Sequence, residues 1–360
     1  MLRVLVFATV FILAFLVNFG ITPLLIKLSH RYKWYDSIDE RKVHPDCMPR
    51  IGGVGIFAGF AAAAFIYVVG CHVCHVKELN DLSKYSHLLL VIGFFIISVM
   101  GLLDDFLNLR AGIKFIIQII AALCISMGGF KFDVFAIPDT DIAFTLVPAV
   151  SHALTILWII AFCNAINLMD GMDGLAGCVS FIGAIFYIII FSITKNFTAM
   201  AVTACLLGSI LAFLFFNYPP AKIYMGDSGS LLLGFSMAVI PLINNVPPVS
   251  SNVLLPSLLI FIIPIMDMIT AIIRRKKRGK PIFSPDREHL HHKLLDFGLS
   301  TRKTLFVICS FSIPAGLCGV MFQLIAGPLA VLFFLIVWLL YASLFITLHY
   351  KNQARKEHLK

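Results

Sequence analysis

The chain has 360 residues, of which 60% are hydrophobic and only 13% are charged. Its mean hydropathy is +0.96, and a water-soluble fold of this length cannot bury that much apolar surface, so the composition excludes a soluble enzyme and predicts a polytopic membrane protein. The formal net charge of +9 is spread over membrane-tethered loops without a recognisable nucleic-acid module, so we expect no nucleic-acid partner.

Eleven apolar runs approach the roughly 17 to 25 residues that a helix needs to cross a bilayer. We therefore predict an all-α fold of about eleven transmembrane helices. Residues 1–350 are expected to form one integral-membrane domain, followed by a basic cytoplasmic tail at 351–360. In chain order, the predicted helices are 3–28, 52–70, 86–103, 112–128, 150–168, 174–193, 198–216, 230–246, 251–273, 303–324 and 327–349.

The distribution of Lys and Arg predicts the orientation of these helices. If the N-terminus lies outside, 23 of the 28 basic residues fall in cytoplasmic loops or the C-terminal tail. Positive charge accumulates on the cytoplasmic side of membrane proteins, so we expect an external N-terminus and a cytoplasmic C-terminus. The five basic residues on the other side are Arg3, Lys77, Lys84, Lys131 and Lys195.

The first predicted cytoplasmic loop reads DERKVHPDCMPRIGGVG and contains Lys42, His44 and Arg50. Two interpretations stay open for these cations. They form a solvated positive-inside patch, or they bind the phosphate of a lipid or a nucleotide. The next, external loop contains Cys71-His72-Val73-Cys74-His75, which fits a haem-attachment pattern. Nothing else in the chain suggests a porphyrin site, so we favour an ordinary external loop there.

Carboxylates gather at the predicted cytoplasmic ends of several helices. Asp104 and Asp105 follow an apolar run from Leu88 to Leu103, and Asp170, Asp173 and Asp227 stand at the ends of other runs. Ionisable residues within membrane helices are costly and usually functional. A single residue of this kind is readily explained as interfacial, but five of them predict a shared site on the cytoplasmic face.

The segment NAINLMDGMDGLAG places Asn164, Asn167, Asp170 and Asp173 at a spacing of three, close to the helical period. We expect them to line one face of a helix before the glycines end it. Side chains of these types can ligate Mg²⁺ or hydrogen-bond to the edge of a base.

The segment NYPPAKIYMGDSGS follows two helices later. Pro219 and Pro220 are expected to stop one helix, and Gly226 to Gly229 to open the next. Backbone N–H groups at a helix start attract phosphate, and Asp227 could hold a metal ion there. Farther along, Asp267 is interpreted as a buried partner of Arg274 or Arg275, or as a wall of the site.

The last polar segment, RRKKRGKPIFSPDREHLHHKLLDFG, contains Arg287, His289, His291 and His292. A His-x-His pair can chelate zinc, although the neighbouring sequence has no Cys or further His to complete a tetrahedral set. Hydrogen-bond donors to a pyrophosphate or a sugar are equally consistent with these side chains.

Six motifs taken together resemble the polyprenyl-phosphate N-acetylhexosamine-1-phosphate transferases of glycosyltransferase family 4. They occur in the family's order and cover about residues 36–300. The motifs are Arg41-Lys42-x-His44, Pro49-Arg50-x-Gly52-Gly53, Gly101-x-x-Asp104-Asp105, Asn164-x-x-Asn167-x-x-Asp170-Gly171-x-Asp173-Gly174, Met225-Gly226-Asp227-x-Gly229-Ser230 and His289-x-His291-His292.

The resemblance implies an eleven-span enzyme of the bacterial inner membrane with a cytoplasmic active site. Its expected reaction transfers N-acetylglucosamine 1-phosphate from UDP-GlcNAc to undecaprenyl phosphate and so starts a teichoic acid, O-antigen or related envelope polymer. Relatives that use phospho-MurNAc-pentapeptide usually carry three consecutive histidines, which Leu290 interrupts here. That donor and other UDP-HexNAc sugars remain alternatives.

The resemblance also implies roles for individual residues. We expect Asp227, with Asn167, to bind Mg²⁺, for which Mn²⁺ could substitute. Asp104 and Asp105 are assigned to the lipid phosphate, and Asn164, Asp170 and Asp173 to positioning the uridine and the metal. Phosphates or the sugar would contact Lys42, His44, Arg287, His289, His291 and His292.

Direct attack by the lipid phosphate is favoured over a phospho-aspartyl intermediate, because a carboxylate bound to Mg²⁺ is a poor free nucleophile. An ion-coupled transporter is the rival function, and it would predict acids near the bilayer midplane, where only Asp267 is expected. Membrane lipids are expected partners, and a homodimer is left open.

Overall fold

The computed structural model describes residues 2–35, 48–73, 84–136, 143–243, 251–281, 284, 286, 288–325 and 327–358. These residues fold almost entirely into helices. The helices are α1 (Leu2–Tyr32), α2 (Gly52–Val73), α4 (Lys84–Leu107), α5 (Ala111–Met127), α6 (Pro148–Met169), α7 (Leu175–Ile193), α8 (Phe197–Asn217), α9 (Gly226–Val239), the 3₁₀ helix η1 (Ile240–Leu242), α10 (Ser251–Ile260), α11 (Ile262–Lys277), α12 (Leu290–Asp296), α13 (Thr301–Leu324) and α14 (Pro328–His358).

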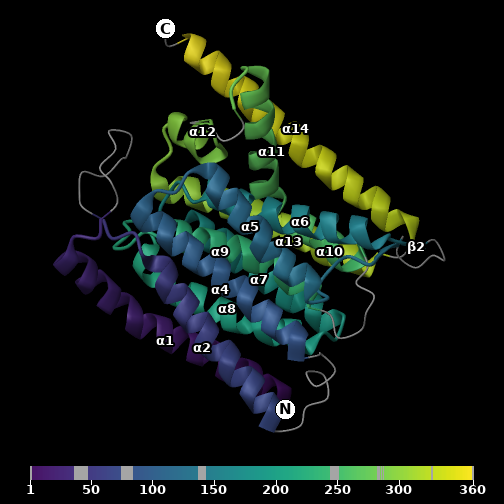
Figure 1. Ribbon diagram of the computed structural model, residues 1–360. Helices are drawn as coiled ribbons and strands as arrows, with labels where there is room; N and C mark the ends of the chain where they lie inside the picture. Colours follow the sequence, from purple (N-terminus) through teal and green to yellow (C-terminus); the bar gives the residue numbers. More distant parts are fainter. Residues whose placement is uncertain are drawn as a thin grey trace.

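The exception to the all-α prediction is a small antiparallel hairpin. Strands β1 (Val134–Ala136) and β2 (Ala143–Thr145) pair with Phe135 opposite Phe144. They join α5 to α6 and carry no part of the predicted site. The helix α14 runs without a break to His358, so it includes the start of the predicted tail (Figure 1).

Eight described helices are long and apolar enough to cross a membrane, and the bent pair of α10 and α11 would make a ninth. The prediction of an all-α polytopic membrane protein is thus confirmed. Along α4, Leu88, Val91, Phe95, Val99 and Leu103 recur every three or four residues and are 36–64% exposed. This spacing forms one apolar stripe on the outside of the bundle, where a lipid environment would cover it.

The short helix α9 lies at the centre of the bundle, where it packs against α2, α4 and α6 (Figure 1). All of its 14 residues are buried except Asp227. Small residues make this close packing possible, since a Cβ added to Gly101 of α4 would lie 2.5 Å from Ser228 Cα. The core of the protein therefore holds Asp227 in place from three sides.

The predicted run 251–273 is divided at Phe261, where α10 and α11 meet at 77°. Pro264, in the first turn of α11, has no N–H to continue the hydrogen bonding of α10, and its ring would clash with an upstream carbonyl. Beyond the bend, Asp267 of α11 accepts a hydrogen bond from Leu290 N at the start of α12, and α12 also contacts α13 and α14. The histidine segment is thereby held against the bundle.

Candidate active site

The candidate active site forms where the ends of α4 and α6 meet the starts of α5 and α9. Lys114, in the first turn of α5, places Nζ 2.6 Å from Asp104 Oδ2 and 3.0 Å from Asp227 Oδ2. The Asp104 side chain is only 3% exposed, whereas that of Asp227 is 16% exposed. Asp227 is therefore the carboxylate of this pair that is more accessible to a substrate.

Asn167, in the last turn of α6, connects that helix to α9. Its Nδ2 donates to Asp227 Oδ1 at 3.0 Å and to Ser230 Oγ at 2.9 Å. Asp170 follows α6 directly, and burial together with the nearby Asp227 charge raises the pKa of its carboxyl to about 7. Among the residues that the structure describes, the Asn167 amide oxygen and the Asp170 carboxylate have no hydrogen-bond partner, so both remain open to a ligand.

Asp105 has a different position from its neighbour Asp104. Its Oδ1 accepts from Asp227 N at 2.7 Å and its Oδ2 from Ser228 N at 3.0 Å, so it caps the start of α9. Gly226 permits this approach, because its φ is +71° and a Cβ there would lie 2.6 Å from Asp105 Oδ2. The Asp105 side chain is 1% exposed, and both of its oxygens are taken up by the backbone of α9, so its role is to position Asp227.

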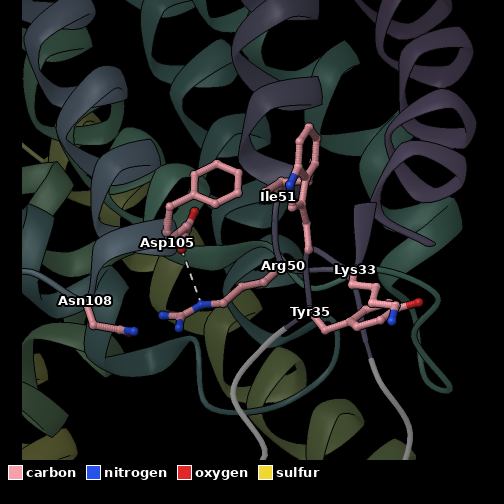
Figure 2. A pocket seen from close by; sticks show the side chains of 8 residues that line it. Lys33, Tyr35, Arg50, Ile51, Asp105 and Asn108 are labelled. Atoms are coloured by element: carbon pink, nitrogen blue, oxygen red, sulfur yellow. Dashed lines mark ion pairs between the residues drawn. The ribbon is translucent and has the colours of Figure 1, made fainter. Parts of the chain in front are cut away.

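Arg50 reaches both α4 and α9, as Figure 2 shows for its ion pair with Asp105. Its Nε lies 3.3 Å from Asp105 Oδ1, and its Nη2 lies 3.6 Å from Asp227 Oδ1. The backbone fixes this arrangement, since Tyr224 N donates to Pro49 O at 2.8 Å. The loop before α2 and the loop before α9 thus run side by side and present Arg50 to the carboxylates.

A cavity of about 250 Å³ opens beside the Arg50–Asp105 pair (Figure 2). Lys33 adds a second cation to its wall, and Trp34, at the end of α1, packs edge-on against Phe106 of α4 with ring centroids 5.5 Å apart. The cavity therefore combines cationic and aromatic groups next to the carboxylate cluster.

The remaining predicted residues of α6 and its following turn contact protein groups. Asn164 Nδ2 donates to Gln118 Oε1 of α5 at 2.8 Å, which joins the two helices. Asp173 Oδ2 accepts from Ala221 N at 3.0 Å. The loop that begins with Pro219 and Pro220, which end α8 as predicted, is therefore held against the turn after α6.

The histidine segment lies against this same turn. His289 Nδ1 is 2.9 Å from Asp267 Oδ2 of α11, whereas Arg274 pairs with Asp286 at 2.6 Å. The His291 ring packs on Gly171, where a Cβ would lie 2.6 Å from Cε1. Burial and the neighbouring His292 lower the pKa of His291 to about 3, so its imidazole is neutral at physiological pH.

Several predictions fall outside the described residues. Lys42, His44 and Arg287, predicted to bind substrate, are among them, as are Cys74 and His75 of the haem-attachment pattern. Their predicted roles stay predictions. Of the thirteen predicted site residues, the structure places ten, which lie on α4, α6, α9 and α12 or directly next to the ends of these helices.

The oxygen donors of the cluster fit the chemistry of Mg²⁺. Carboxylate and amide oxygens are its preferred protein ligands, and it usually takes one or two carboxylates together with substrate phosphates. Asn167 contacts Asp227 directly, and Asp170 is near enough to feel the charge of Asp227, so these three residues supply such oxygens. Within the described ranges, no three His, Cys, Asp or Glu side chains form a metal site by themselves. The arrangement thus suits an ion shared with a substrate better than a closed structural zinc site.

Sequence reasoning missed Lys114, which bridges the two central carboxylates. It lies in the apolar run 112–128, ten residues after Asp104. A lysine inside such a run is itself a signal, because a charge there is costly unless it is paired. Gln118, one turn later on α5, was also missed, because its partner Asn164 is distant in the sequence.

We expect Asp105→Ala to destabilise the protein rather than only slow its chemistry. The substitution leaves two N–H groups of α9 without an acceptor and Arg50 without one partner, which should cost about 2–4 kcal/mol. Thermal unfolding in detergent should show a clearly lower midpoint than for Asp133→Ala, which removes only the partly exposed pair with Lys131. Equal midpoints for the two variants would contradict the capping role.

Comparison with known proteins agrees with these motifs. The model of glycosyl transferase family 4 matches residues 87–245, which include the carboxylates of α4, α6 and α9. A probable undecaprenyl-phosphate N-acetylglucosaminyl 1-phosphate transferase of Bacillus subtilis is 37% identical over 83% of this chain and 80% of its own length.

Two further relatives show the range of the similarity. A decaprenyl-phosphate N-acetylglucosaminephosphotransferase of Mycobacterium leprae is 33% identical over 84% of this chain and 80% of its own length. A phospho-N-acetylmuramoyl-pentapeptide-transferase of Lactobacillus helveticus is 32% identical over 76% of this chain and 85% of its own length. The chain therefore belongs to glycosyl transferase family 4, among the polyprenyl-phosphate N-acetylhexosamine-1-phosphate transferases that its motifs resemble.

Proposed function

We propose that this protein transfers N-acetylglucosamine 1-phosphate from UDP-GlcNAc to undecaprenyl phosphate and releases UMP. The observation that carries the proposal is the bridge from Lys114 to Asp104 and Asp227, with Arg50 and Asn167 against the same carboxylate. This cluster combines cations for phosphates with oxygens for a divalent ion. The names of the relatives, which include undecaprenyl and decaprenyl phosphate and N-acetylglucosamine, support the choice of substrates.

The proposed reaction is an exchange at phosphorus. An oxygen of the lipid phosphate forms a bond to the β-phosphorus of UDP-GlcNAc, and the bond from that phosphorus to the bridging oxygen breaks. That oxygen leaves with UMP, and the product is GlcNAc-diphosphoryl-undecaprenol. Both reactants are anionic, so positioning and charge neutralisation must supply most of the rate acceleration.

The chain's own groups can meet these needs. Lys114 and Arg50 would hold phosphate oxygens beside Asp227, and the cavity next to Arg50 gives a phosphate room to enter. Asp227, Asn167 and Asp170 would bind Mg²⁺ or Mn²⁺, which when bound neutralises charge that develops on the phosphates. Asp104 would orient the lipid phosphate through Lys114, and the histidines would contact the sugar or the diphosphate.

We propose direct attack by the lipid phosphate rather than a phospho-aspartyl intermediate. Both candidate nucleophiles are engaged in this structure: Asp104 accepts from Leu109 N and Lys114, and Asp227 accepts from Asn167 and Lys114. A carboxylate with these partners is a weak nucleophile. Recovery of a phosphosugar adduct on either aspartate from a quenched reaction would refute direct attack.

The sugar and the membrane arrangement are also proposals. Leu290, which interrupts the histidines, is 7% exposed and lines an apolar cavity together with Val307 and Phe345. We assign the chain to the GlcNAc branch, which starts an envelope polysaccharide at the bacterial inner membrane.

The eight long helices, the bent pair, α5 and α9 correspond to the eleven predicted runs, which supports eleven spans with an external N-terminus and a cytoplasmic site.

The function is tested with purified protein in detergent or nanodiscs. Undecaprenyl phosphate and Mg²⁺ are supplied with UDP-GlcNAc, UDP-GalNAc or UDP-MurNAc-pentapeptide, and released UMP is measured. We expect UMP release with UDP-GlcNAc that requires the lipid phosphate. Release only with UDP-MurNAc-pentapeptide would move the chain to the other branch, and no release with any donor would refute the transferase function.

Arg50→Gln should weaken phosphate binding while leaving α9 capped by Asp105. Because one charged donor is removed from the phosphate side, kcat/KM for UDP-GlcNAc is expected to fall about 10²-fold. Lys131→Gln, which removes a cation on the opposite end of the bundle beside Asp133, is the matched control and should retain the wild-type value. Equal kcat/KM for Arg50→Gln and the control would exclude Arg50 from substrate binding.

A further inference from the structure

The buried carboxylate of Asp267 holds two consecutive residues of the histidine segment. Its Oδ2 lies 2.9 Å from His289 Nδ1, and its Oδ1 accepts from Leu290 N at 3.0 Å. Asp267 is 2% exposed and His289 is 5% exposed, so water does not compete for this contact. One side chain of α11 therefore fixes both the start of α12 and the orientation of the His289 ring.

The contact also determines where His289 carries its hydrogen. An ionised carboxylate only accepts hydrogen bonds, so Nδ1 must be the protonated nitrogen. The other nitrogen, Nε2, is then the one that can accept from, or after protonation donate to, a ligand. Within the described part of the chain, Nε2 has no hydrogen-bond partner. A carboxylate that orients a functional imidazole in this way is a common device of active sites.

The orientation of His289 is connected to the carboxylate cluster through His291. The two rings are almost parallel, with an angle of 5° between their planes and centroids 6.0 Å apart. His291 in turn packs on Gly171, the residue after Asp170. The Asp267 contact thus sets the position of an imidazole next to the turn that carries one of the proposed metal-binding oxygens.

We propose that Asp267 is a positioning residue of the transferase: it holds His289 as the Nδ1–H tautomer and aims Nε2 at the anionic or hydroxyl groups of the bound sugar diphosphate. This inference rests on the proposed function and extends it to a residue of the bent pair α10 and α11. The bend between α10 and α11 contributes to this role, because Asp267 follows it and contacts the start of α12. A purely structural carboxylate would cap α12 without affecting the chemistry of His289.

The Asp267→Asn variant separates these roles. The amide oxygen can still accept from Leu290 N, so α12 remains capped, but the amide NH₂ now faces His289 Nδ1. The hydrogen must then move to Nε2, and the imidazole presents the wrong tautomer. We expect kcat to fall about 10²-fold with little change in KM for UDP-GlcNAc, and a thermal midpoint close to that of the wild type.

A double-mutant cycle tests whether Asp267 acts through His289. His289→Ala is expected to lose a similar factor in kcat, and the double variant Asp267→Asn/His289→Ala should be no slower than His289→Ala alone. Losses that multiply in the double variant would overturn the proposal. Asp133→Asn, which alters a carboxylate outside the site, is the control and should keep the wild-type kcat.

His289→Asn provides a second test that does not depend on the folding of Asp267→Asn. Its amide can donate to Asp267 from the position of Nδ1 but has nothing at the position of Nε2. We expect the same loss of kcat as in His289→Ala, and a thermal midpoint nearer the wild type. Wild-type kcat in His289→Asn would refute the inference, whereas failure of the wild-type protein to release UMP would refute the proposed function instead.

Discussion

Asp227→Asn should leave only a small residual rate of transfer and leave the protein folded. The variant keeps the size and most contacts of the side chain, but it removes the charge that we assign to Mg²⁺ and that faces Lys114 and Arg50. A loss of about 10³-fold in kcat is expected, at the upper end of the 10²- to 10³-fold that one preorganised electrostatic group commonly contributes, because Asp227 contacts both cations of the site. UMP release measures the loss, and thermal unfolding in detergent checks the fold.

A titration with Mg²⁺ makes this prediction specific. If Asp227 binds the metal, the Mg²⁺ concentration that gives half of the residual activity should rise in the variant. Asp133→Asn is the matched control, because it makes the same chemical change at the other end of the bundle. Each group assigned to the site should account for more than a tenfold change in rate. A variant whose activity is within about tenfold of the wild type would therefore show that Asp227 is not the metal ligand.

Lys114→Met should have the second-largest effect on transfer. The substitution keeps a long side chain but removes the ammonium that lies within 3.0 Å of both Asp104 and Asp227. The two carboxylates would then repel each other and the incoming phosphates, and we expect kcat to fall about 10²- to 10³-fold. Lys114→Arg should recover part of the rate, because it restores the charge with a different geometry.

The Mg²⁺ requirement distinguishes Lys114 from Asp227. Removing a competing cation from Asp227 should not raise the half-saturating Mg²⁺ concentration of Lys114→Met, in contrast to Asp227→Asn. A variant with wild-type kcat would mean that Lys114 only neutralises the buried Asp104. A strongly raised Mg²⁺ requirement would mean that the lysine organises the metal ligands instead of the phosphates.

The carboxylate cluster was predictable because charge is costly in a membrane. Asp104, Asp170 and Asp227 each stand at the end of an apolar run, and the orientation derived from Lys and Arg puts these ends on one side. The structure confirms that the three helices meet. The prolines at 219 and 220 likewise predicted the end of α8, because proline cannot continue a helix.

The roles of adjacent residues were not predictable from the pattern. Asp104 and Asp105 differ by one position, yet one pairs with Lys114 and the other caps α9, because successive helical residues point about 100° apart. Which of the two side chains faces α9 depends on how α4 packs against α9. Gly101 and Gly226 permit this close packing, because a Cβ at either position would clash with the other helix. Sequence spacing alone could not contain this information.

The bend between α10 and α11 and the Asp267–His289 contact were missed for a related reason. The run 251–273 is apolar enough to be read as one helix, and Pro264 is tolerated in many membrane helices. Only the packed structure shows that the chain turns at Phe261 and returns α12 to the site. The partner of Asp267 therefore lies 22 residues ahead rather than one or two turns along its own helix.

The most direct test of the account follows the β-phosphorus of the donor. UDP-GlcNAc labelled at that phosphorus is incubated with the wild-type protein, undecaprenyl phosphate and Mg²⁺, and the lipid and aqueous phases are separated. Transfer of the phosphosugar predicts that the label enters the lipid product and that the released nucleotide is unlabelled UMP. Label retained in a released nucleotide diphosphate, with sugar alone on the lipid, would contradict the account.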